Sequence, residues 1–367
     1  MLARVRSCGV LGIEGYPLEV EVDNHPGQRR FTMVGLPDAA VKESQERVQS
    51  ALRSAGFRYL RGVVVVNLAP ADVRKEGSAL DLPIALGMAA AGEQLPATRF
   101  PDYAIVGELA LDGSVRPVAG ALCMAMAARD QGLRGIILPR ANAEEAGVVP
   151  EIDVIPVATL SDAAEFVTER GDIAPFRTDL RGAFSQAQAY CPDLTDVKGQ
   201  AHVKRALTVA AAGSHNLLMI GPPGTGKTML ASRLPGILPE MTFEEALETT
   251  RIYSVAGHLS DKGNLVFRRP FRAPHHTATT VSISGGGHGQ QPMPGEVSLA
   301  HNGVLFLDEL PEFNRAALEV LRQPLEEGLV HIRRASYAVT FPSRFMLVVA
   351  MNPCPCGCRT DPRRECR

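Results

Sequence analysis

The segment Gly221-Pro-Pro-Gly-Thr-Gly-Lys-Thr228 decides the fold of the second half of this chain. It follows the apolar run Asn216-Leu-Leu-Met-Ile220 and fits the pattern of a phosphate-binding loop between a strand and a helix. Glycines let backbone N–H groups curl around an anion. An ordinary Gly-Pro turn is the alternative, but the flanks favour nucleoside triphosphate binding by Gly221, Pro222, Pro223, Gly224, Thr225, Gly226, Lys227 and Thr228.

Two side chains of this segment are candidates for direct contacts with the nucleotide. Lys227 is expected to reach the β and γ phosphates, and the Thr228 hydroxyl is expected to bind Mg²⁺. The run from Met229 to Leu234 indicates a helix whose positive N-terminal end faces the phosphates. ATP and Mg²⁺ are therefore the expected cofactors.

A second pattern supports the same chemistry. The run Gly303-Val-Leu-Phe-Leu307 is apolar throughout, which is typical of a buried strand, and it ends in Asp308-Glu309. We expect Asp308 to hold Mg²⁺ and Glu309 to orient and deprotonate the attacking water. This is the Walker B pattern of an ATP hydrolase.

A third apolar run, Phe345-Met-Leu-Val-Val-Ala350, is soon followed by Asn352. A polar residue at the end of a buried strand is a candidate sensor of the γ-phosphate or the lytic water. A turn residue ahead of Pro353 is the equally weighted alternative.

Composition limits the setting of this chemistry. The chain has 367 residues, 45% of them hydrophobic, which is enough for two globular domains. It has neither a signal-peptide pattern nor an apolar run near membrane-span length, and its seven cysteines suggest reduced thiols, so a cytoplasmic protein is expected. The formal net charge of −2 gives no global basic footprint for nucleic acid.

The chain divides where periodicity is lost. Residues 168–195 collect proline, glycine and polar residues and are interpreted as a linker between a domain at 1–167 and a domain at 196–367. The first domain shows mixed α/β signals. They are an alternating strand at Leu18–Val22, helical spacing from Val41 to Gly56, a buried strand at Gly62–Asn67, a helix at Leu80–Ala91, a strand at Tyr103–Val106 and a hairpin turning at Asp112-Gly113.

The stretches Lys75-Glu-Gly-Ser78 and Gly107-Glu-Leu…Arg116-Pro-Val-Ala-Gly120 resemble the proteolytic domain of the Lon family, a ribosomal-protein-S5-like α/β fold with a Ser-Lys dyad. Aligned on these motifs, the family's serine falls on Ala79 and its lysine near Leu122. Ser78 is one position away and has no activating lysine at the required place. We therefore interpret the domain as noncatalytic and the chain as no protease.

The second domain resembles the magnesium-chelatase-like AAA+ ATPases of the YifB/ComM type. The resemblance is carried by Asp196-Val-Lys-Gly-Gln200, the phosphate-binding loop, Arg269-Pro-Phe-Arg-Ala-Pro-His-His-Thr277, Pro294 to Phe313, and Met351-Asn-Pro-Cys-Pro-Cys-Gly357. It implies a parallel-sheet α/β/α P-loop domain after a Lon-like one, and a homo-hexameric ring. For this family it also implies a motor for DNA branch migration in natural transformation or recombination, acting on branched or single-stranded DNA.

The segment from Arg268 to Pro294 is rich in glycine, histidine and hydroxyl residues and is predicted to be an exposed, mobile loop. Facing a ring pore, it would place Arg268, Arg269 and Arg272 on a phosphate backbone. A surface loop packed on the adjacent subunit is the alternative. His275 and His276 lack further metal ligands nearby and are assigned a structural or interface role.

Two β-patterned runs, Gly328–Ile332 and Ala335–Phe341, flank the basic pair Arg333-Arg334 and predict a hairpin. In related AAA+ proteins a hairpin at this place engages substrate, so both arginines are candidate DNA contacts. A solvated hairpin tip is the alternative.

Cys354, Cys356, Cys358 and Cys366 form a cluster that is a candidate Zn²⁺ site. The Cys-x-Cys-x-Cys spacing is tighter than in common structural zinc sites, so a cluster without metal is the alternative.

The family resemblance also implies a further strand, a helical lid and an arginine finger that this sequence lacks, so we expect an incomplete ATPase core without its lid. Three functions remain open: a DNA-remodelling motor, a cofactor-insertion ATPase like the magnesium chelatase small subunit, and a regulatory or scaffold ATPase.

Overall fold

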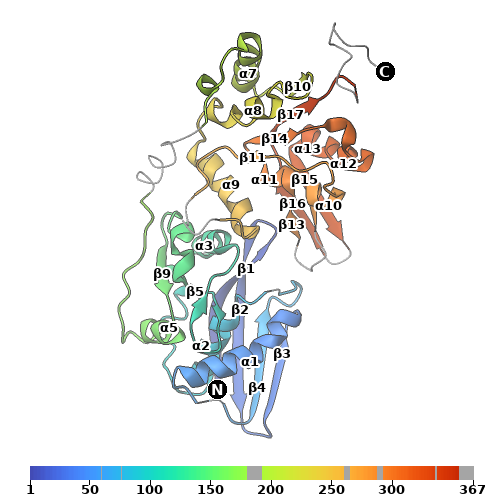
Figure 1. Ribbon diagram of the computed structural model, residues 1–367. Coiled ribbons are helices and arrows are strands. Elements are labelled where there is room, and N and C mark those ends of the chain that lie inside the picture. Colours follow the sequence, from blue (N-terminus) through green and yellow to red (C-terminus); the bar gives the residue numbers. More distant parts are fainter. Residues whose placement is uncertain are drawn as a thin grey trace. The chain divides into compact units, whose positions relative to one another are not determined.

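The structure, a computed structural model, describes residues 1–58, 60–75, 77–179, 192–259, 265–286, 292–334 and 337–354. The chain folds into two compact units, one of Met1–Leu180 with Ser254–Asn264 and one of Arg181–Tyr253 with Leu265–Arg367. Figure 1 labels their elements. The expected domain limits remain a prediction, because residues 180–191 of the linker lie outside the described residues.

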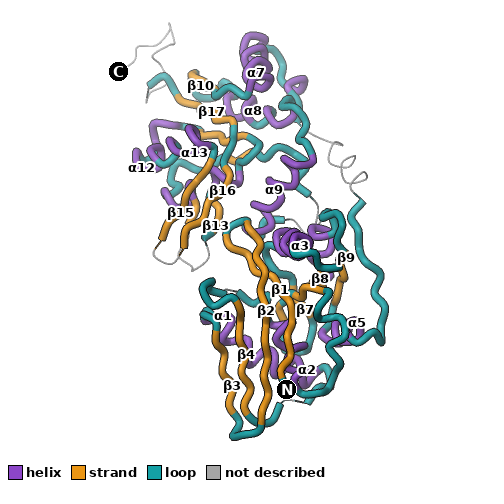
Figure 2. Tube along the Cα trace, turned by 180° about the vertical axis from the view of Figure 1, so that it is seen from behind, coloured by secondary structure: helices purple, strands orange, loops and turns teal. Residues whose placement is uncertain are grey.

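The first unit contains a four-stranded sheet of order β1-β2-β4-β3 (Figure 2). β1 and β2 are antiparallel, β2 and β4 are antiparallel, and β3 and β4 are parallel. The strands are β1 (Leu2–Leu11), β2 (Glu14–His25), β3 (Arg30–Val34) and β4 (Val63–Ala69). β4 alternates between half-buried and buried positions, as expected for a strand whose two faces differ.

A parallel sheet of order β5-β8-β9 and the β6–β7 hairpin complete the strands of this unit. Their bounds are β5 (Tyr103–Ile105), β6 (Glu108–Leu109), β7 (Val115–Arg116), β8 (Gly135–Pro139) and β9 (Asp153–Val157). The predicted hairpin is confirmed. Gly113 has a φ of 86°, which favours glycine, and Asp112 Oδ1 accepts hydrogen bonds from the amide and hydroxyl of Ser114.

The core of this unit is built around one apolar helix. All eleven residues of α2 (Asp81–Ala91) are buried, and α2 contacts both α1 (Ala39–Ser54) and the strands β1 and β2. α1 begins after Asp38, whose carboxylate accepts the Val41 amide at 2.7 Å. The other helices are α3 (Ala121–Asp130), η1 (Arg140–Asn142), α4 (Ala143–Ala146) and α5 (Leu160–Val167). The first unit is thus the expected Lon-like α/β domain.

The second unit is built on a parallel sheet of order β10-β17-β14-β11. Its strands are β10 (Leu217–Ile220), β11 (Phe271–Arg272), β14 (Val304–Leu307) and β17 (Met346–Met351). All four residues of β14 are buried, as predicted from its apolar run. Phe271 stacks on Phe306 with ring centroids 5.8 Å apart, which packs the edge strand against its neighbour.

Shorter strands and helices surround this sheet. The β15–β16 hairpin is confirmed, with an antiparallel register from Leu329↔Pro342 to Arg334↔Tyr337. The strands are β12 (Gly285–Gly286), β13 (Met293–Pro294), β15 (Leu329–Arg334) and β16 (Tyr337–Pro342). The helices are η2 (Leu194–Asp196), α7 (Ala201–Gly213), α8 (Lys227–Ala231), η3 (Leu234–Gly236), α9 (Phe243–Val255), α10 (Thr280–Ser284), α11 (Glu296–Leu299), η4 (Leu310–Glu312), α12 (Arg315–Glu319) and α13 (Arg322–Glu327).

The prediction of one mobile loop from Arg268 to Pro294 is wrong for the residues that the structure describes. This segment supplies β11, the parallel edge strand beside β14, and α10, whose Ile283 is fully buried. A two-residue strand and a five-residue helix are too short to produce a periodic apolar pattern, which explains the error.

Candidate functional site

The phosphate-loop pattern lies between β10 and α8, as predicted. Gly224 and Gly226 have φ angles of 80° and 84°, a region that side chains disfavour, so glycine is required by conformation at both positions. Thr225 Oγ1 donates to Pro222 O at 2.9 Å and closes the loop on itself. The residues from Gly224 to Thr228 in this tight turn carry the backbone N–H groups that could bind an anion, whereas Pro222 and Pro223 carry none.

Lys227 joins this loop to the neighbouring strand. Its Nζ donates to Gly221 O at 2.7 Å, to Pro222 O at 3.1 Å and to Asn352 Oδ1 at 3.2 Å. Asn352 follows β17, which pairs with β10 in the sheet. The predicted γ-phosphate ligand and the predicted sensor thus lie within hydrogen-bond distance of each other.

The two residues predicted to bind Mg²⁺ also meet. Thr228 Oγ1 donates to Asp308 Oδ2 at 2.6 Å, which brings together the start of α8 and the end of β14. A hydroxyl oxygen and a carboxylate oxygen are hard ligands of the kind that Mg²⁺ prefers. Thr228 and Glu309 are exposed, and Asp308 is half-buried. The Thr228 and Asp308 side chains are therefore accessible from solvent, which fits a metal ion that arrives together with a nucleotide.

Glu309 has an unusual backbone conformation for a glutamate. Its φ is 53°, in the left-handed region, and its amide donates to Asp308 Oδ1 at 2.9 Å. Its Oε2 lies 3.9 Å from Nδ1 of His276, a residue that follows β11. Sequence reasoning assigned His276 no role at this site, because only the sheet order brings it close to Glu309.

Three of the five arginines predicted to contact DNA lie between Arg268 and Arg272 and differ in their surroundings. Arg268 is exposed. Arg269 donates to Asn302 O at 2.7 Å and to Glu245 Oε2 at 3.0 Å, and its side chain is only 14% exposed. Arg272 makes a bidentate pair with Glu296, at 2.7 and 2.8 Å, and this hydrogen bonding raises the pKa of Arg272. These contacts give Arg269 and Arg272 structural roles within the domain.

Sequence reasoning missed both acidic partners, Glu245 and Glu296. Each lies 24 positions from its arginine, so no short-range spacing could have revealed the pairs. In the hairpin, Arg333 is an exposed residue of β15, while nothing is described of the Arg334 side chain.

Most of the cysteine cluster falls beyond the part of the chain that the structure describes. Cys354 is half-buried, and Cys356, Cys358 and Cys366 lie outside the described residues. Within the described ranges, no group of three or more His, Cys, Asp or Glu side chains is arranged to hold a metal ion. The same ranges contain no helix long and apolar enough to cross a membrane.

In the Lon-like unit, Ser78 and Leu122, which lie at or beside the positions aligned with the Ser-Lys dyad, are held by contacts within the unit. Ser78 Oγ donates to the Glu108 carboxylate, which also lies 3.6 Å from Arg116, and Leu122 is fully buried. Asp81 accepts two hydrogen bonds from Arg47, at 2.7 and 3.1 Å, and burial raises its pKa. Lys75 is buried, and its Nζ has no hydrogen-bond partner among the described residues.

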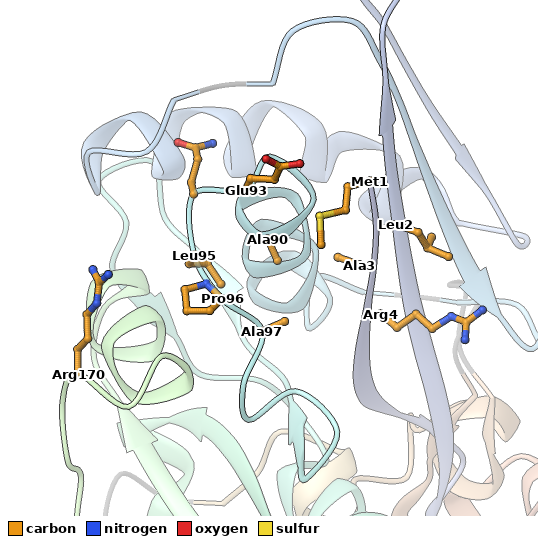
Figure 3. Close-up of a pocket in the computed structure, with 11 residues that line it drawn as sticks. Met1, Leu2, Ala3, Arg4, Ala90, Glu93, Leu95, Pro96, Ala97 and Arg170 are labelled. Carbon is orange, nitrogen blue, oxygen red and sulfur yellow. The ribbon is translucent and has the colours of Figure 1, made fainter.

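The charged side chains that line a pocket of about 520 Å³ in this unit do not point toward a common centre. It is lined by Met1 to Arg4, by the end of α2 and its following turn, and by Arg170. Figure 3 shows Arg4 and Arg170 at opposite ends of it. Arg4 Nε also donates to Glu21 at 3.1 Å. Charged groups that do not converge give no basis for assigning a ligand.

Comparisons with known proteins agree with this architecture. The family described as "Magnesium chelatase, subunit ChlI" matches residues 193–367, and that described as "Subunit ChlI of Mg-chelatase" matches residues 20–142. "Competence protein ComM" of Haemophilus influenzae is 48% identical over 358 residues, which are 97% of this chain and 69% of that protein. "Uncharacterized protein YifB" of Escherichia coli is 47% identical, with 97% and 69% covered. "Archaeal Lon protease" of Thermococcus kodakarensis is 25% identical over 180 residues, 46% of this chain and 28% of that protein.

Proposed function

The chain belongs to the YifB/ComM family of magnesium-chelatase-like AAA+ proteins, and on this premise we propose that it binds ATP with Mg²⁺ and hydrolyses ATP to remodel branched DNA. The ATPase part of the proposal rests on one observation: four predicted residues contact one another in pairs where the parallel strands end. Lys227 contacts Asn352, and Thr228 contacts Asp308. These residues come from the segments that follow three neighbouring strands, β10, β17 and β14.

Each residue has a role that fits its chemistry. The loop from Gly221 to Thr228 holds the phosphates through backbone amides, and Lys227 neutralises their charge. Thr228 and Asp308 are the residues that would hold Mg²⁺, which, when bound, offsets the charge that develops on the phosphates. Glu309 takes the proton of the attacking water, and Asn352 orients that water or the γ-phosphate.

The DNA part of the proposal rests on a relative's name and on two exposed arginines. The matched relative from Haemophilus influenzae is named a competence protein. Of the five arginines predicted to contact DNA, Arg333 on the β15–β16 hairpin and Arg268 before β11 are the two that are described as exposed, and we assign the contact with a phosphate backbone to them. The proposal includes a cytoplasmic, homo-hexameric ring. It also includes a noncatalytic Lon-like domain at 1–167, a linker at 168–195 and the ATPase core from 196.

A second candidate function follows from the name of the matched family. Because residues 193–367 match a magnesium chelatase subunit, an ATPase that drives cofactor insertion or regulates a partner protein is the alternative. It shares the nucleotide site and differs in what stimulates hydrolysis.

ATPase assays with and without branched DNA test both candidates. The wild-type whole gene product is compared with Glu309→Gln, which keeps the size of the side chain but removes the base. We expect hydrolysis that DNA stimulates and that Glu309→Gln abolishes while ATP binding persists. An ATPase rate that DNA does not change would favour the alternative function. Equal rates for wild type and Glu309→Gln would refute the assigned role of Glu309.

A further inference from the structure

The first strand of the Lon-like unit, β1, is an edge strand whose outer backbone groups can be identified. In the order β1-β2-β4-β3, β1 pairs with β2 alone. Met1 and Asn24 exchange two backbone hydrogen bonds, at 2.6 and 3.3 Å. In an antiparallel pair, residues that exchange such bonds alternate with residues whose N–H and C=O groups point away from the partner strand. The backbone groups of Leu2 and Arg4 therefore face the outer edge of the sheet.

A pocket borders this edge at the start of β1. Further along the strand the edge is covered, since Ser7 Oγ donates to Ile105 O at 2.8 Å and β5 contacts β1. The pocket of about 520 Å³ is lined by four consecutive residues, Met1 to Arg4. Because side chains alternate between the two faces of a strand, four consecutive lining residues indicate that the edge itself borders the pocket. No described strand pairs with β1 there.

The pocket has an apolar floor. Ala3, Ala90 and Leu95 are buried and line it, and the first two are small enough to leave room for another side chain. Met1 and Leu2 line the same pocket although they are 65% and 49% exposed. Exposed apolar side chains next to a free strand edge are the features of a surface that pairs with another segment.

Two charged side chains that line the pocket are available to a partner. Glu93, in the turn after α2, and Arg170, after α5, are both exposed, and neither side chain has an ion-pair partner among the described residues. Arg4, in contrast, pairs with Glu21. Figure 3 shows Arg170 across the pocket from β1. A smaller pocket of about 160 Å³ also has Arg170 in its lining, so Arg170 lies where the two pockets meet.

This site is separate from the positions aligned with the Ser-Lys dyad. α2 begins at Asp81, close to Ser78 in sequence, and ends at Ala91, next to residues that line the pocket. The two places therefore lie at opposite ends of α2, whose length is about 16 Å. A segment bound in the pocket would not occupy the position at which the Lon family cleaves peptides.

The charged groups alone assign no ligand to the pocket, but the strand edge beside it does. We propose that the edge of β1 at Leu2 and Arg4 is a docking site for an extended segment of a partner protein, which adds to the sheet as a further strand. Its apolar side chains enter the pocket over Ala90 and Leu95, and its acidic side chain pairs with Arg170. The site gives the Lon-like unit a role in recruitment, and it does not depend on the proposed ATPase activity.

Peptide selection against the whole gene product tests the site. The probe is a phage-displayed library of random peptides, and the most enriched sequence is synthesised with a fluorescent label for anisotropy measurements. We expect this peptide to combine apolar residues with an acidic one. Arg170→Glu should weaken its binding by about three- to tenfold, because an attractive charge pair becomes a repulsive one. Replacing the acidic residue of the peptide by lysine should restore binding to Arg170→Glu.

Arg140→Glu is the matched control. Arg140 is also an exposed arginine of the Lon-like unit, but it lines neither pocket, so this variant should bind the peptide as wild type does. Thermal melts check that both variants are folded.

Methylation of the peptide backbone tests strand addition separately from the charge. Every second N–H group of an added strand faces β1, so methylating these groups should weaken binding by about tenfold or more. Methylating the N–H groups between them should leave the affinity within about threefold of the unmodified peptide. A peptide that covers the pocket without pairing would show no such alternation.

Three results would each overturn the inference. They are a selection that yields no peptide able to bind the whole gene product, equal affinities of Arg170→Glu and Arg140→Glu for the peptide, and methylation effects that do not alternate. Sedimentation with and without the peptide tests another occupant. If the peptide dissociates oligomers of the protein, a second copy occupies this edge and the assignment to a partner protein is wrong.

Discussion

Thr228 Oγ1 lies 2.6 Å from Asp308 Oδ2, although the two residues are 80 positions apart. The contact unites the two sequence patterns that best predict a nucleotide site, and it places a hydroxyl and a carboxylate where one metal ion can bind both. It is the structural relationship on which the proposed ATPase depends most.

Replacing Thr228 by valine should weaken Mg²⁺-dependent ATP binding. Valine keeps the shape of threonine but removes the hydroxyl, so we expect the affinity for MgATP to fall by about tenfold or more. Titration calorimetry with Mg²⁺ and with EDTA measures the metal-dependent part. Ser232→Ala is the control, because Ser232 Oγ donates to Met229 O within the helical segment. Unchanged MgATP affinity in Thr228→Val would argue against Thr228 as a metal ligand.

Replacing Arg333 by alanine should weaken DNA binding in a way that depends on salt. If Arg333 contacts one phosphate, its loss should reduce the slope of log affinity against log salt concentration by about 1. Fluorescence anisotropy with branched DNA at several salt concentrations gives this slope. Arg315→Ala is a matched control in the same unit, since the Arg315 side chain is 92% exposed and pairs with Glu319 on its own helix. Equal slopes for wild type and Arg333→Ala would remove the hairpin from the DNA interface.

Replacing Arg47 by alanine should destabilise the Lon-like unit strongly. The substitution leaves the Asp81 carboxylate, whose side chain is 1% exposed, without its bidentate partner. We expect the free energy of unfolding to fall by about 3–5 kcal/mol. Burial already raises the pKa of Asp81, so protonation should relieve the cost as the pH falls. Urea unfolding at pH 5 and pH 8 tests both statements.

Arg4→Ala is the control for this measurement. Arg4 pairs with a carboxylate as well, that of Glu21, but the Arg4 side chain is 63% exposed. We therefore expect Arg4→Ala to lower the free energy of unfolding by no more than about 1 kcal/mol. Equal losses in the two variants would contradict the assigned difference in burial.

Replacing Glu145 by glutamine should stabilise the Lon-like unit above neutral pH. Burial raises the pKa of Glu145 to about 7 from 4.5. Between these two values the folded state holds a proton that the unfolded state releases, so stability decreases as the pH rises through this window and is constant above it. Glutamine stays neutral and can still accept the hydrogen bond from Asn142. The free energy of unfolding of Glu145→Gln should therefore exceed that of wild type by on the order of 3 kcal/mol at pH 8.

Urea unfolding of wild type and Glu145→Gln at pH 5, 6, 7 and 8 provides the test. Glu144→Gln is a neighbouring control, since Glu144 is exposed on the same short helix, α4. A gain that does not change with pH would show that Glu145 is charged in the folded protein.

Local patterns predicted much of this protein correctly. The glycines at 224 and 226 are needed for a turn with positive φ, so that turn is visible in the sequence. The buried strand Val304–Leu307 and the Asp112-Gly113 hairpin are likewise short-range features, set by hydropathy and by turn chemistry. Asp308, Glu309 and Asn352 could be chosen because a polar residue after an apolar strand needs only a few neighbouring positions to be recognised.

The sequence by itself therefore determined the candidate nucleotide-site residues and the strands that carry them, since both are encoded within a few consecutive positions. Only the tertiary structure decided which of them meet: Lys227 with Asn352, Thr228 with Asp308, and Glu309 with His276. It likewise decided that Arg269 and Arg272 are tied to Glu245 and Glu296 within the domain. The physical reason is that a parallel sheet places strands side by side in an order that differs from their order along the chain. Contacts at the strand ends depend on that order, and no local pattern of residues contains it.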